Sequence, residues 1–208
     1  MICGIDEAGR GPLAGPVCAA AVVLSDDFPV EILNDSKKLS GAKRERAALI
    51  IYEKAAAWGI GWSTHEEIDK INILQASLLA MKRAFHAMME EADDLFLDSL
   101  LKAGEFEVIA DGNANPDIPC PKRDAFAYEG NFSCKTLVKA DAKIHAVMAA
   151  SIIAKTTRDA LMTDFALMYP EYGYEKHKGY PTKAHIGIIE KLGPSPIQRL
   201  SFKPKALQ

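Results

Sequence analysis

The first 24 residues decide the fold, and they read MICGIDEAGRGPLAGPVCAAAVVL. Residues 1–5 and 17–24 are apolar runs with the length and composition of buried strands. A turn rich in glycine and proline, residues 9–16, separates them. Asp6 and Glu7 follow the first run directly. The sequence therefore places two carboxyl groups at the end of a buried strand, beside glycines that let a ligand approach the backbone.

Two nucleotide-binding motifs share the glycine spacing of this stretch, and neither fits its context. A phosphate loop over residues 4–11 would need Lys and Ser or Thr where Arg10 and Gly11 stand, and it would set two carboxylates against phosphate oxygens. A dinucleotide fingerprint over residues 9–14 must open a helix, whereas a strand-like run follows here. The carboxyl groups of Asp6 and Glu7 are therefore the candidate functional groups of this turn.

Helical and strand-like patterns alternate along the rest of the chain. Spacing and capping residues predict helices over residues 42–58, 72–91, 142–168 and 182–191. Strands are predicted over residues 59–63, 106–110 and 136–139. Asp98 lies in a stretch whose spacing fits a continuing helix, so it is left out of the candidate site. These elements predict a single α/β domain with a mixed sheet.

Composition places the chain among ordinary globular proteins. It has 208 residues, of which 49% are hydrophobic and 25% charged, so it needs no disulfide framework and is neither disordered nor collagen-like. Its strongest candidate for a membrane-spanning segment, the apolar run of residues 17–24, is too short to cross a bilayer. The N-terminus shows no secretory signal. We expect a cytoplasmic protein that does not enter a membrane, with reduced thiols at Cys3, Cys18, Cys120 and Cys134.

The net charge of −3 is unevenly distributed. Residues 171–208 contain seven Lys or Arg and three acids, a balance of +4, which leaves −7 on the other 170 residues. A basic end on an acidic body indicates a polyanionic partner.

Two further acids follow predicted strands, Asp111 after residues 106–110 and Asp141 after residues 136–139. Strand ends in an open α/β sheet meet at one edge, so these acids are expected near Asp6 and Glu7. Four carboxylates held together repel one another unless a cation neutralises them, and oxygen ligands of this kind select Mg²⁺ or Mn²⁺. Two such ions can promote phosphodiester hydrolysis. Acids also end strands simply because solvent is near, so the pattern alone leaves both interpretations open.

Basic and aromatic residues supply the second half of the pattern. Residues 176–181, KHKGYP, combine lysines such as Lys178 with Tyr180 beside a flexible glycine. Lysines can hold a phosphate backbone, and a tyrosine can stack on a base or sugar. Lys37 and Lys38, beside Asn34 and Ser36, form a second candidate phosphate contact. With an acidic metal site, these residues predict a nuclease that acts on nucleic acid.

Several blocks of this sequence closely resemble ribonuclease HII, the bacterial type 2 ribonuclease H. The resemblance runs in order from about residue 4 to residue 202. It is carried by GIDEAGRGPLAGP (residues 4–16), NDSKKLS (34–40), INILQA (71–76), VKAD (138–141), AASIIAK (149–155) and HKGY (177–180).

The resemblance implies a ribonuclease H-like fold, with a mixed five-stranded sheet flanked by helices and a small, mainly helical C-terminal part. Residues 1–170 would form the catalytic domain, and residues 171–208 a basic loop and helix packed on the same domain. The implied activity is that of a monomeric endoribonuclease using Mn²⁺ or Mg²⁺. It would hydrolyse the RNA strand of RNA–DNA hybrids and nick duplex DNA on the 5′ side of embedded ribonucleotides, by two-metal-ion catalysis.

The resemblance also implies residue roles. The catalytic, metal-binding carboxylates would be Asp6, Glu7, Asp111 and Asp141. The motif Gly9, Arg10 and Gly11 would read the ribose 2′-hydroxyl through its backbone, the group that distinguishes RNA from DNA. Tyr180 would sense the RNA-to-DNA junction. Independently of the resemblance, the polar and basic residues Ser36, Lys37 and Lys178 are expected to contact the substrate backbone.

Two departures from the family pattern stand out. Ala140 precedes the fourth acid where the family usually has glycine, and residues 90–105 form a longer stretch than expected before the third acid. Two alternatives remain at this point: another two-metal enzyme of the same fold, such as a DNA resolvase or integrase, and a hybrid-binding module without catalysis.

Overall fold

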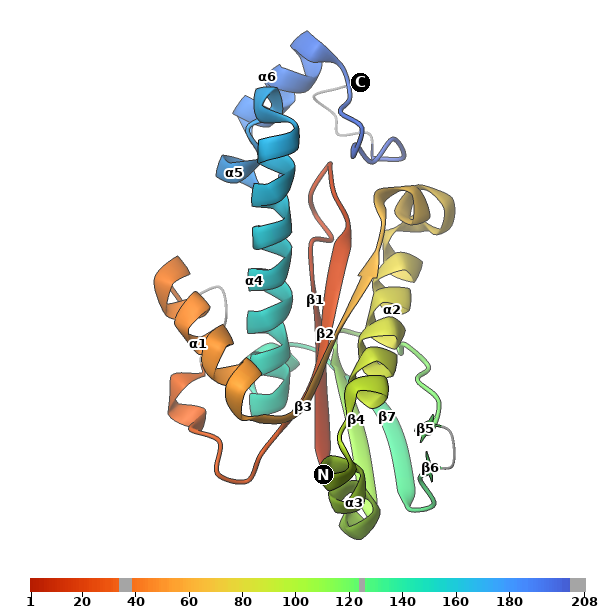
Figure 1. The fold of residues 1–208 in the computed structure, drawn as a ribbon. Helices are drawn as coiled ribbons and strands as arrows, with labels where there is room; N and C mark the ends of the chain where they lie inside the picture. Colours follow the sequence, from red (N-terminus) through yellow and green to blue (C-terminus); the bar gives the residue numbers. More distant parts are fainter. Residues whose placement is uncertain (34–38, 124–125, 203–208) are drawn as a thin grey trace.

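The computed structural model describes residues 1–33, 39–123 and 126–202, and its centre is a mixed five-stranded sheet flanked by helices (Figure 1). This confirms the predicted fold class. The sheet has the strand order β3-β2-β1-β4-β7, formed by β1 (Ile2–Ala8), β2 (Val17–Leu24), β3 (Ala55–Ser63), β4 (Glu105–Asp111) and β7 (Asn131–Leu137). A separate short pair is formed by β5 (Lys122–Arg123) and β6 (Phe126–Ala127).

The helices lie on both faces of this sheet and beyond one of its ends (Figure 1). The longer ones are α1 (Gly41–Lys54), α2 (His65–Glu91), α3 (Asp94–Ala103), α4 (His145–Met168) and α6 (Lys183–Leu192). The short ones are α5 (Tyr174–His177) and the 3₁₀ turns η1 (Val30–Ile32), η2 (Ala140–Ala142) and η3 (Pro170–Tyr172). In the described part of the chain, no helix combines the length and hydropathy that a membrane span requires.

Strand direction brings the first and third acids together. β2 is antiparallel to both of its neighbours, whereas β4 runs parallel to β1 with Ile5 opposite Ala110. The next residues in this register are Asp6 and Asp111. Because parallel strands end at the same edge, both carboxyl groups reach one side of the sheet.

Alternation along β2 divides the core into two layers. Ala19 and Ala21 face the layer built with α2, whereas Ala20 and Val22 face the layer built with α1 and α4. Figure 1 shows these helices on opposite sides of the sheet. All four side chains are buried, which explains why β2 reads as a continuous apolar run.

Helix α4 crosses the sheet unusually close to β1. A Cβ atom on Gly4 would lie 2.2 Å from the backbone of Ala146 and Val147. Glycine at this position therefore allows the helix backbone to contact the strand. This contact fixes the position of α4 along β1, and so determines which side chains of the following helical turns lie near the end of the strand.

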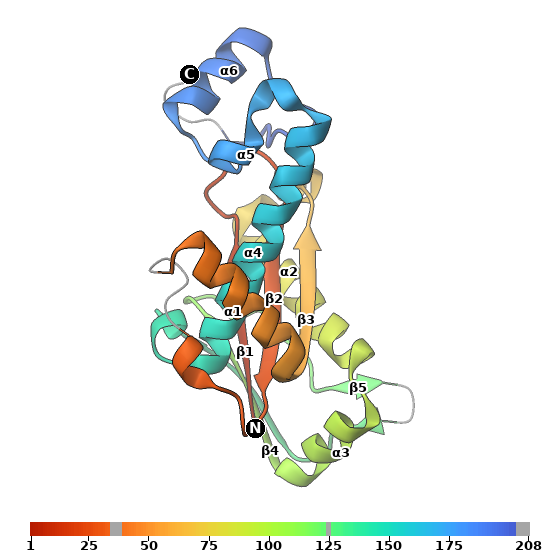
Figure 2. The same cartoon turned by 60° about the vertical axis from the view of Figure 1, so that its left-hand side comes forward.

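The C-terminal segment packs against the glycine-rich turn beyond the sheet (Figure 2). Leu13 N–H donates to the carbonyl of Gly179 at 2.8 Å, and Arg199 N–H donates back to the carbonyl of Leu13 at 2.8 Å. Gly15 N–H donates to the carbonyl of Ile197 at 2.9 Å. The turn between β1 and β2 is therefore held by residues that follow it by more than 160 positions.

Helix boundaries differ most from the sequence expectations at two places, and the helix predicted over residues 142–168 also begins later, at His145. The predicted helix over residues 42–58 ends at Lys54, because Trp58 already belongs to β3 and pairs with Val22. The helix predicted to begin at Asn72 begins at His65, behind a capping box of Thr64 and Glu67.

Asn72 nevertheless marks a real interruption in α2. Its φ of 66° breaks the helix, and its Oδ1 accepts the N–H groups of Leu74 and Gln75 as a new N-cap. The sequence pattern thus found the second helical start and missed the first.

Strand boundaries shift the acids relative to their elements. β1 continues to Ala8, so Asp6 and Glu7 belong to the strand and do not follow it. β7 ends at Leu137, earlier than the predicted strand over residues 136–139, and Asp141 lies in η2. The unexpectedly long stretch before the third acid contains α3, in which Asp98 is helical, as expected, and exposed.

Candidate active site

A cleft of about 280 Å³ opens at the edge of the sheet where β1 and β4 end. It brings together three of the four predicted acids, the whole glycine-arginine-glycine motif and Tyr180, although these residues span most of the chain. Its lining residues are Asp6, Glu7, Ala8, Gly9, Arg10, Gly11, Arg44, Asp111, Ser151, Lys155 and Tyr180.

Asp6 is the most perturbed acid of the cleft. It is only 6% exposed, and this burial raises the pKa of its carboxyl group well above the ordinary value. The neighbouring charges of Glu7 and Asp111 raise the pKa further, whereas hydrogen bonds from the Ser151 side chain and the Glu7 amide lower it. A carboxylate at this position gains strongly from a nearby cation.

Glu7 presents an unsatisfied oxygen to the same region. Burial raises the pKa of its carboxyl group, and Arg10 opposes this shift through a contact of 3.2 Å between Nη1 and Oε1. The second oxygen, Oε2, is buried and has no hydrogen-bond partner among the residues that the structure describes. A buried anionic oxygen without a partner is costly to maintain, so its environment favours an additional positive ligand.

Asp111 is oriented by the chain that follows β7. Its Oδ1 accepts the backbone N–H of Ala140 at 2.7 Å. Asp141, the next residue, is also buried and is not among the residues that line the cleft. Lys139, with a φ of 59°, takes the left-handed turn before Ala140. The alanine that replaces the family's glycine therefore needs no unusual backbone conformation.

The acids fit a divalent metal in chemistry. Carboxylate oxygens in a partly buried group suit hard cations such as Mg²⁺ and Mn²⁺, and Glu7 Oε2 supplies an oxygen with no protein partner. Within residues 1–33, 39–123 and 126–202, no three His, Cys, Asp or Glu side chains already stand in a metal-holding arrangement.

The glycine-arginine-glycine motif lines the same cleft as the acids. Gly9 has a φ of +101°, and a Cβ atom there would lie 2.1 Å from Arg158 Nε, so only glycine fits. A Cβ atom on Gly11 would contact the ring of Tyr180 at 3.5 Å. The motif and Tyr180 are therefore direct neighbours in the cleft.

Two histidines hold the backbone that carries Tyr180. Gly179 N–H donates to His177 Nδ1 at 3.2 Å, and His185 Nδ1 lies 3.0 Å from the carbonyl of Tyr180. The two imidazole rings stack with their centroids 4.3 Å apart. Burial lowers the pKa of both histidines, so both are neutral at pH 7.

Sequence reasoning missed three polar side chains of the cleft. Ser151 and Lys155 are four residues apart on α4 and therefore share one helix face. Lys155 Nζ pairs with Asp159 at 2.6 Å and lies 5.8 Å from the centre of the Tyr180 ring. Arg44 reaches the cleft from α1. The i, i+4 spacing of Ser151 and Lys155 within AASIIAK is the signal that could have found them.

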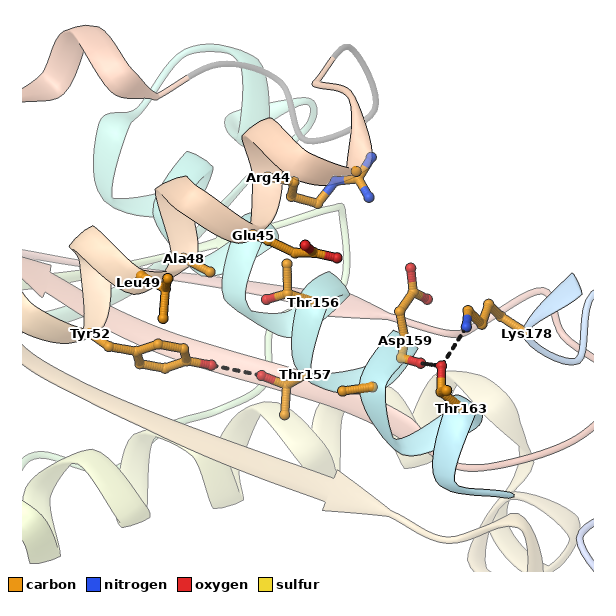
Figure 3. A pocket seen from close by; sticks show the side chains of 12 residues that line it. Arg44, Glu45, Ala48, Leu49, Tyr52, Thr156, Thr157, Asp159, Thr163 and Lys178 are labelled. Atoms are coloured by element: carbon orange, nitrogen blue, oxygen red, sulfur yellow. Dashed lines mark hydrogen bonds between the residues drawn. The ribbon is translucent and has the colours of Figure 1, made fainter. Parts of the chain in front are cut away.

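The predicted phosphate contacts lie elsewhere. Lys178 lines a larger groove of about 610 Å³ between α1 and α4, and its Nζ donates to Thr163 Oγ1 at 2.6 Å (Figure 3). Arg44 lines both the groove and the cleft, so the two hollows adjoin. Ser36 and Lys37 lie outside the described residues.

Comparison with known proteins gives a consistent result. The family model for ribonuclease HII matches residues 3–205. The ribonuclease HII of Treponema denticola is 51% identical over 208 residues and covers all of both chains. The crystal structure of ribonuclease H2 from Pyrococcus horikoshii OT3 matches with a TM-score of 0.60 and 25% identity, covering 99% of this chain and 94% of that one.

A further solved structure, Bst ribonuclease HIII in complex with Mn²⁺, is similar in fold. Its TM-score is 0.66 at 18% identity, over 99% of this chain and 67% of that one. The match of the family model over nearly the whole sequence, together with the full-length relative, settles the family. The chain belongs to the ribonuclease HII family, whose members are metal-dependent hydrolases acting on RNA in RNA–DNA hybrids.

Proposed function

We propose that this chain is an endoribonuclease that cleaves the RNA strand of RNA–DNA hybrids and nicks duplex DNA at embedded ribonucleotides. Cleavage on the 5′ side of the ribonucleotide would leave a 3′-hydroxyl and a 5′-phosphate. The observation that carries this proposal is the shared cleft, which Asp6, Glu7 and Asp111 line together with a glycine loop and an exposed tyrosine. An acid cluster favours a metal, and the other residues that line the cleft can contact a nucleic acid strand.

Metal binding is assigned to Asp6, Glu7 and Asp111, with Asp141 as the fourth ligand. Two Mn²⁺ or Mg²⁺ ions would supply positive charge to the scissile phosphate and to the departing 3′ oxygen. The unpartnered Oε2 of Glu7 supports this assignment. The Mn²⁺ complex of Bst ribonuclease HIII supports an ion of this class.

Recognition of the ribonucleotide is assigned to the backbone of Gly9, Arg10 and Gly11. The 2′-hydroxyl can both donate and accept a hydrogen bond, so backbone groups at close approach can distinguish ribose from deoxyribose. Tyr180, which is 38% exposed beside Gly11, would stack on the nucleotide at the RNA-to-DNA junction.

Phosphate contacts are assigned to Lys178, Ser36 and Lys37. The groove that Lys178 lines adjoins the cleft, so a strand leaving the cleft could continue along it. An ammonium group there would hold the strand through its charge, with no preference for sequence.

We propose residues 1–170 as the catalytic domain and residues 171–208 as a substrate-facing part of the same domain. The hydrogen bonds between the glycine-rich turn and residues 179–199 support this division. We also propose a cytoplasmic monomer. All four cysteines are free thiols, as a reducing compartment favours.

Mapping the nick on a defined duplex tests the proposed function. One ribonucleotide is placed in an otherwise all-DNA duplex, and products are sized with Mg²⁺, with Mn²⁺ and without metal. We expect a single nick on the 5′ side of the ribonucleotide that requires either ion. Cleavage of a matched all-DNA duplex would favour a DNA resolvase or integrase, and metal-independent binding without cleavage would favour a binding module.

A further inference from the structure

Two buried arginines support the glycine-rich turn from behind. Arg199 is 0% exposed and Arg158 is 1% exposed, and both direct their guanidinium groups at backbone carbonyls. Burying a guanidinium group is expensive unless its donors are satisfied, so each of these contacts constrains the turn strongly.

Arg199 binds the turn at four points. Its Nε donates to the carbonyl of Gly15 at 2.8 Å, and its Nη2 donates to that of Gly9 at 2.7 Å. Its Nη1 donates to the carbonyls of Arg10 at 3.2 Å and Pro12 at 2.8 Å. A planar fork of donors thus organises a turn that forms no regular secondary structure of its own.

Arg158 connects this turn with the loop of Tyr180. Its Nε donates to the carbonyl of Pro16 at 2.9 Å, and its Nη2 donates to that of Ala14 at 3.2 Å. Its Nη1 donates to the carbonyl of Lys178 at 3.1 Å. The two arginines therefore fix both the glycine motif and the segment that leads into Tyr180.

Peptide geometry determines what the other side of the turn presents. In a trans peptide the N–H group points away from the C=O group of the preceding residue. The carbonyls of Gly9 and Arg10 point at Arg199, so the N–H groups of Arg10 and Gly11 point away from it. Across the described residues, neither N–H has a backbone acceptor. Both residues line the cleft.

We propose that Arg199, assisted by Arg158, is the positioning residue that sets ribose specificity. It holds the carbonyls of Gly9 and Arg10 inward, so that the amides of Arg10 and Gly11 face the 2′-hydroxyl in the cleft. Neither arginine touches substrate. This inference rests on the proposed function, because it requires that the motif reads the ribose.

The test measures ribose discrimination directly, without turnover. All proteins carry Asp6→Asn to prevent cleavage, and their Kd values are compared for a duplex with one ribonucleotide and for the same duplex made of DNA only. Arg199→Lys and Arg158→Lys keep the charge but lose the planar fork. Gln198→Met is the matched control, since Gln198 is buried next to Arg199 and its Oε1 has no hydrogen-bond partner among the described residues.

We expect the ratio of the two Kd values to fall by about fivefold in Arg199→Lys, as loss of one or two oriented amide hydrogen bonds would give. Arg158→Lys should show a smaller fall, and Gln198→Met should keep the ratio. Affinity for the all-DNA duplex should stay the same in all three. A general structural defect would instead weaken both duplexes equally.

Each failure has a distinct meaning. If the Asp6→Asn parent itself shows no preference for the ribonucleotide, the proposed reading of ribose is wrong. If the parent discriminates and Arg199→Lys keeps the same ratio, the positioning role is wrong. Loss of the folded state in both lysine variants, seen by circular dichroism, would also overturn it, because the arginines would then support the whole domain.

Discussion

Two groups of like charges are buried at the candidate cleft: the acids that line it, and two arginines behind its glycine-rich turn. In the cleft, Asp6 and Glu7 lie close to Asp111, and burial together with this repulsion raises the pKa of the first two. Behind the glycine-rich turn, Arg158 and Arg199 are buried together, and burial with the neighbouring arginine lowers the pKa of Arg199 to about 9. In both groups, burial disfavours the charged form, because the surrounding protein solvates a charge less well than water does.

The difference lies in what satisfies each charge. The arginines donate to carbonyls of the chain itself, so the protein alone balances their cost. Glu7 Oε2 has no such partner in the described part of the chain. A buried charge that the fold satisfies supports structure, whereas one that the fold leaves unsatisfied indicates where a ligand binds.

Asp6→Asn gives the largest expected effect and tests the acids of the cleft. Loss of one negative metal ligand should lower the nicking rate by about 10³-fold on a duplex with a single ribonucleotide. Without metal, the variant should melt at the same temperature as the wild type or higher, because a repulsive buried carboxylate is removed.

Asp98→Asn is the matched control, an exposed acid on α3 that should leave both measurements unchanged. A rate within tenfold of wild type for Asp6→Asn would remove Asp6 from the metal site.

Tyr180→Ala tests the proposed stacking role of Tyr180, which lines the cleft beside Gly11. Loss of a stacking contact worth roughly 1–3 kcal/mol should lower kcat/KM on the single-ribonucleotide duplex by about 5- to 150-fold. Continuous RNA–DNA hybrids should be affected less, because they need no junction sensing. Kinetics on both substrates measures the difference.

Tyr180→Phe keeps the ring and serves as the control. An equal loss of kcat/KM on both substrates in Tyr180→Ala would argue against a junction-sensing role.

Divalent ions should raise the stability of the protein through the acids of the cleft, and this effect should not depend on Arg199. At 100 times its Kd, an ion that binds only the folded state adds about 2.7 kcal/mol to the free energy of unfolding. Thermal melts of the wild type with and without Mn²⁺ should show this as a rise in Tm. Asp6→Asn should lose most of the rise, whereas Arg199→Lys should keep it. The same rise in Asp6→Asn and wild type would place the ion elsewhere.

The smallest expected effect is a change in how the stability of the protein depends on pH, and it comes from the buried ring of His185. Burial lowers the pKa of His185, so the unfolded chain takes up a proton more readily than the folded one once the pH falls below about 6.5. The stability that the neutral ring contributes is present above that pH and is lost as the pH falls further. Asp6 and Glu7 act with the opposite sign, since their raised pKa values favour the folded state in acid.

His185→Phe should therefore flatten the acid-side loss of Tm between pH 7.5 and 5 by a few degrees in metal-free protein. His86→Gln, at an exposed position of α2, should keep the wild-type slope. An unchanged slope in His185→Phe would show that the buried ring does not control this loss.

Local patterns in the sequence were sufficient for the fold class and for most of the acid site. The apolar run of β2 predicted a buried strand, and the acids at the ends of β1 and β4 predicted a shared edge. Boundaries were less predictable. Trp58 fits a helical pattern as well as a strand, and only its pairing with Val22 decides between them.

Long-range contacts account for what the sequence did not show. Arg158 and Arg199 read as ordinary basic residues, because nothing near them in the chain indicates burial. Asp141 follows a predicted strand in the sequence, yet it lies in a 3₁₀ turn and does not line the cleft with Asp111.

The sequence by itself determined the alternation of strands and helices, the residue types at the strand ends and the family. The first two follow from short-range propensities and from the period of apolar residues, whereas the family follows from the resemblance of blocks such as GIDEAGRGPLAGP (residues 4–16) to ribonuclease HII. Only the tertiary structure decided which buried charges are hydrogen-bonded by the chain, as those of Arg199 are, and which are not, as at Glu7 Oε2 within the described residues. That outcome depends on contacts such as Arg199 with Gly9, 190 residues apart, and their geometry exists only once the sheet, α4 and the C-terminal segment have packed together.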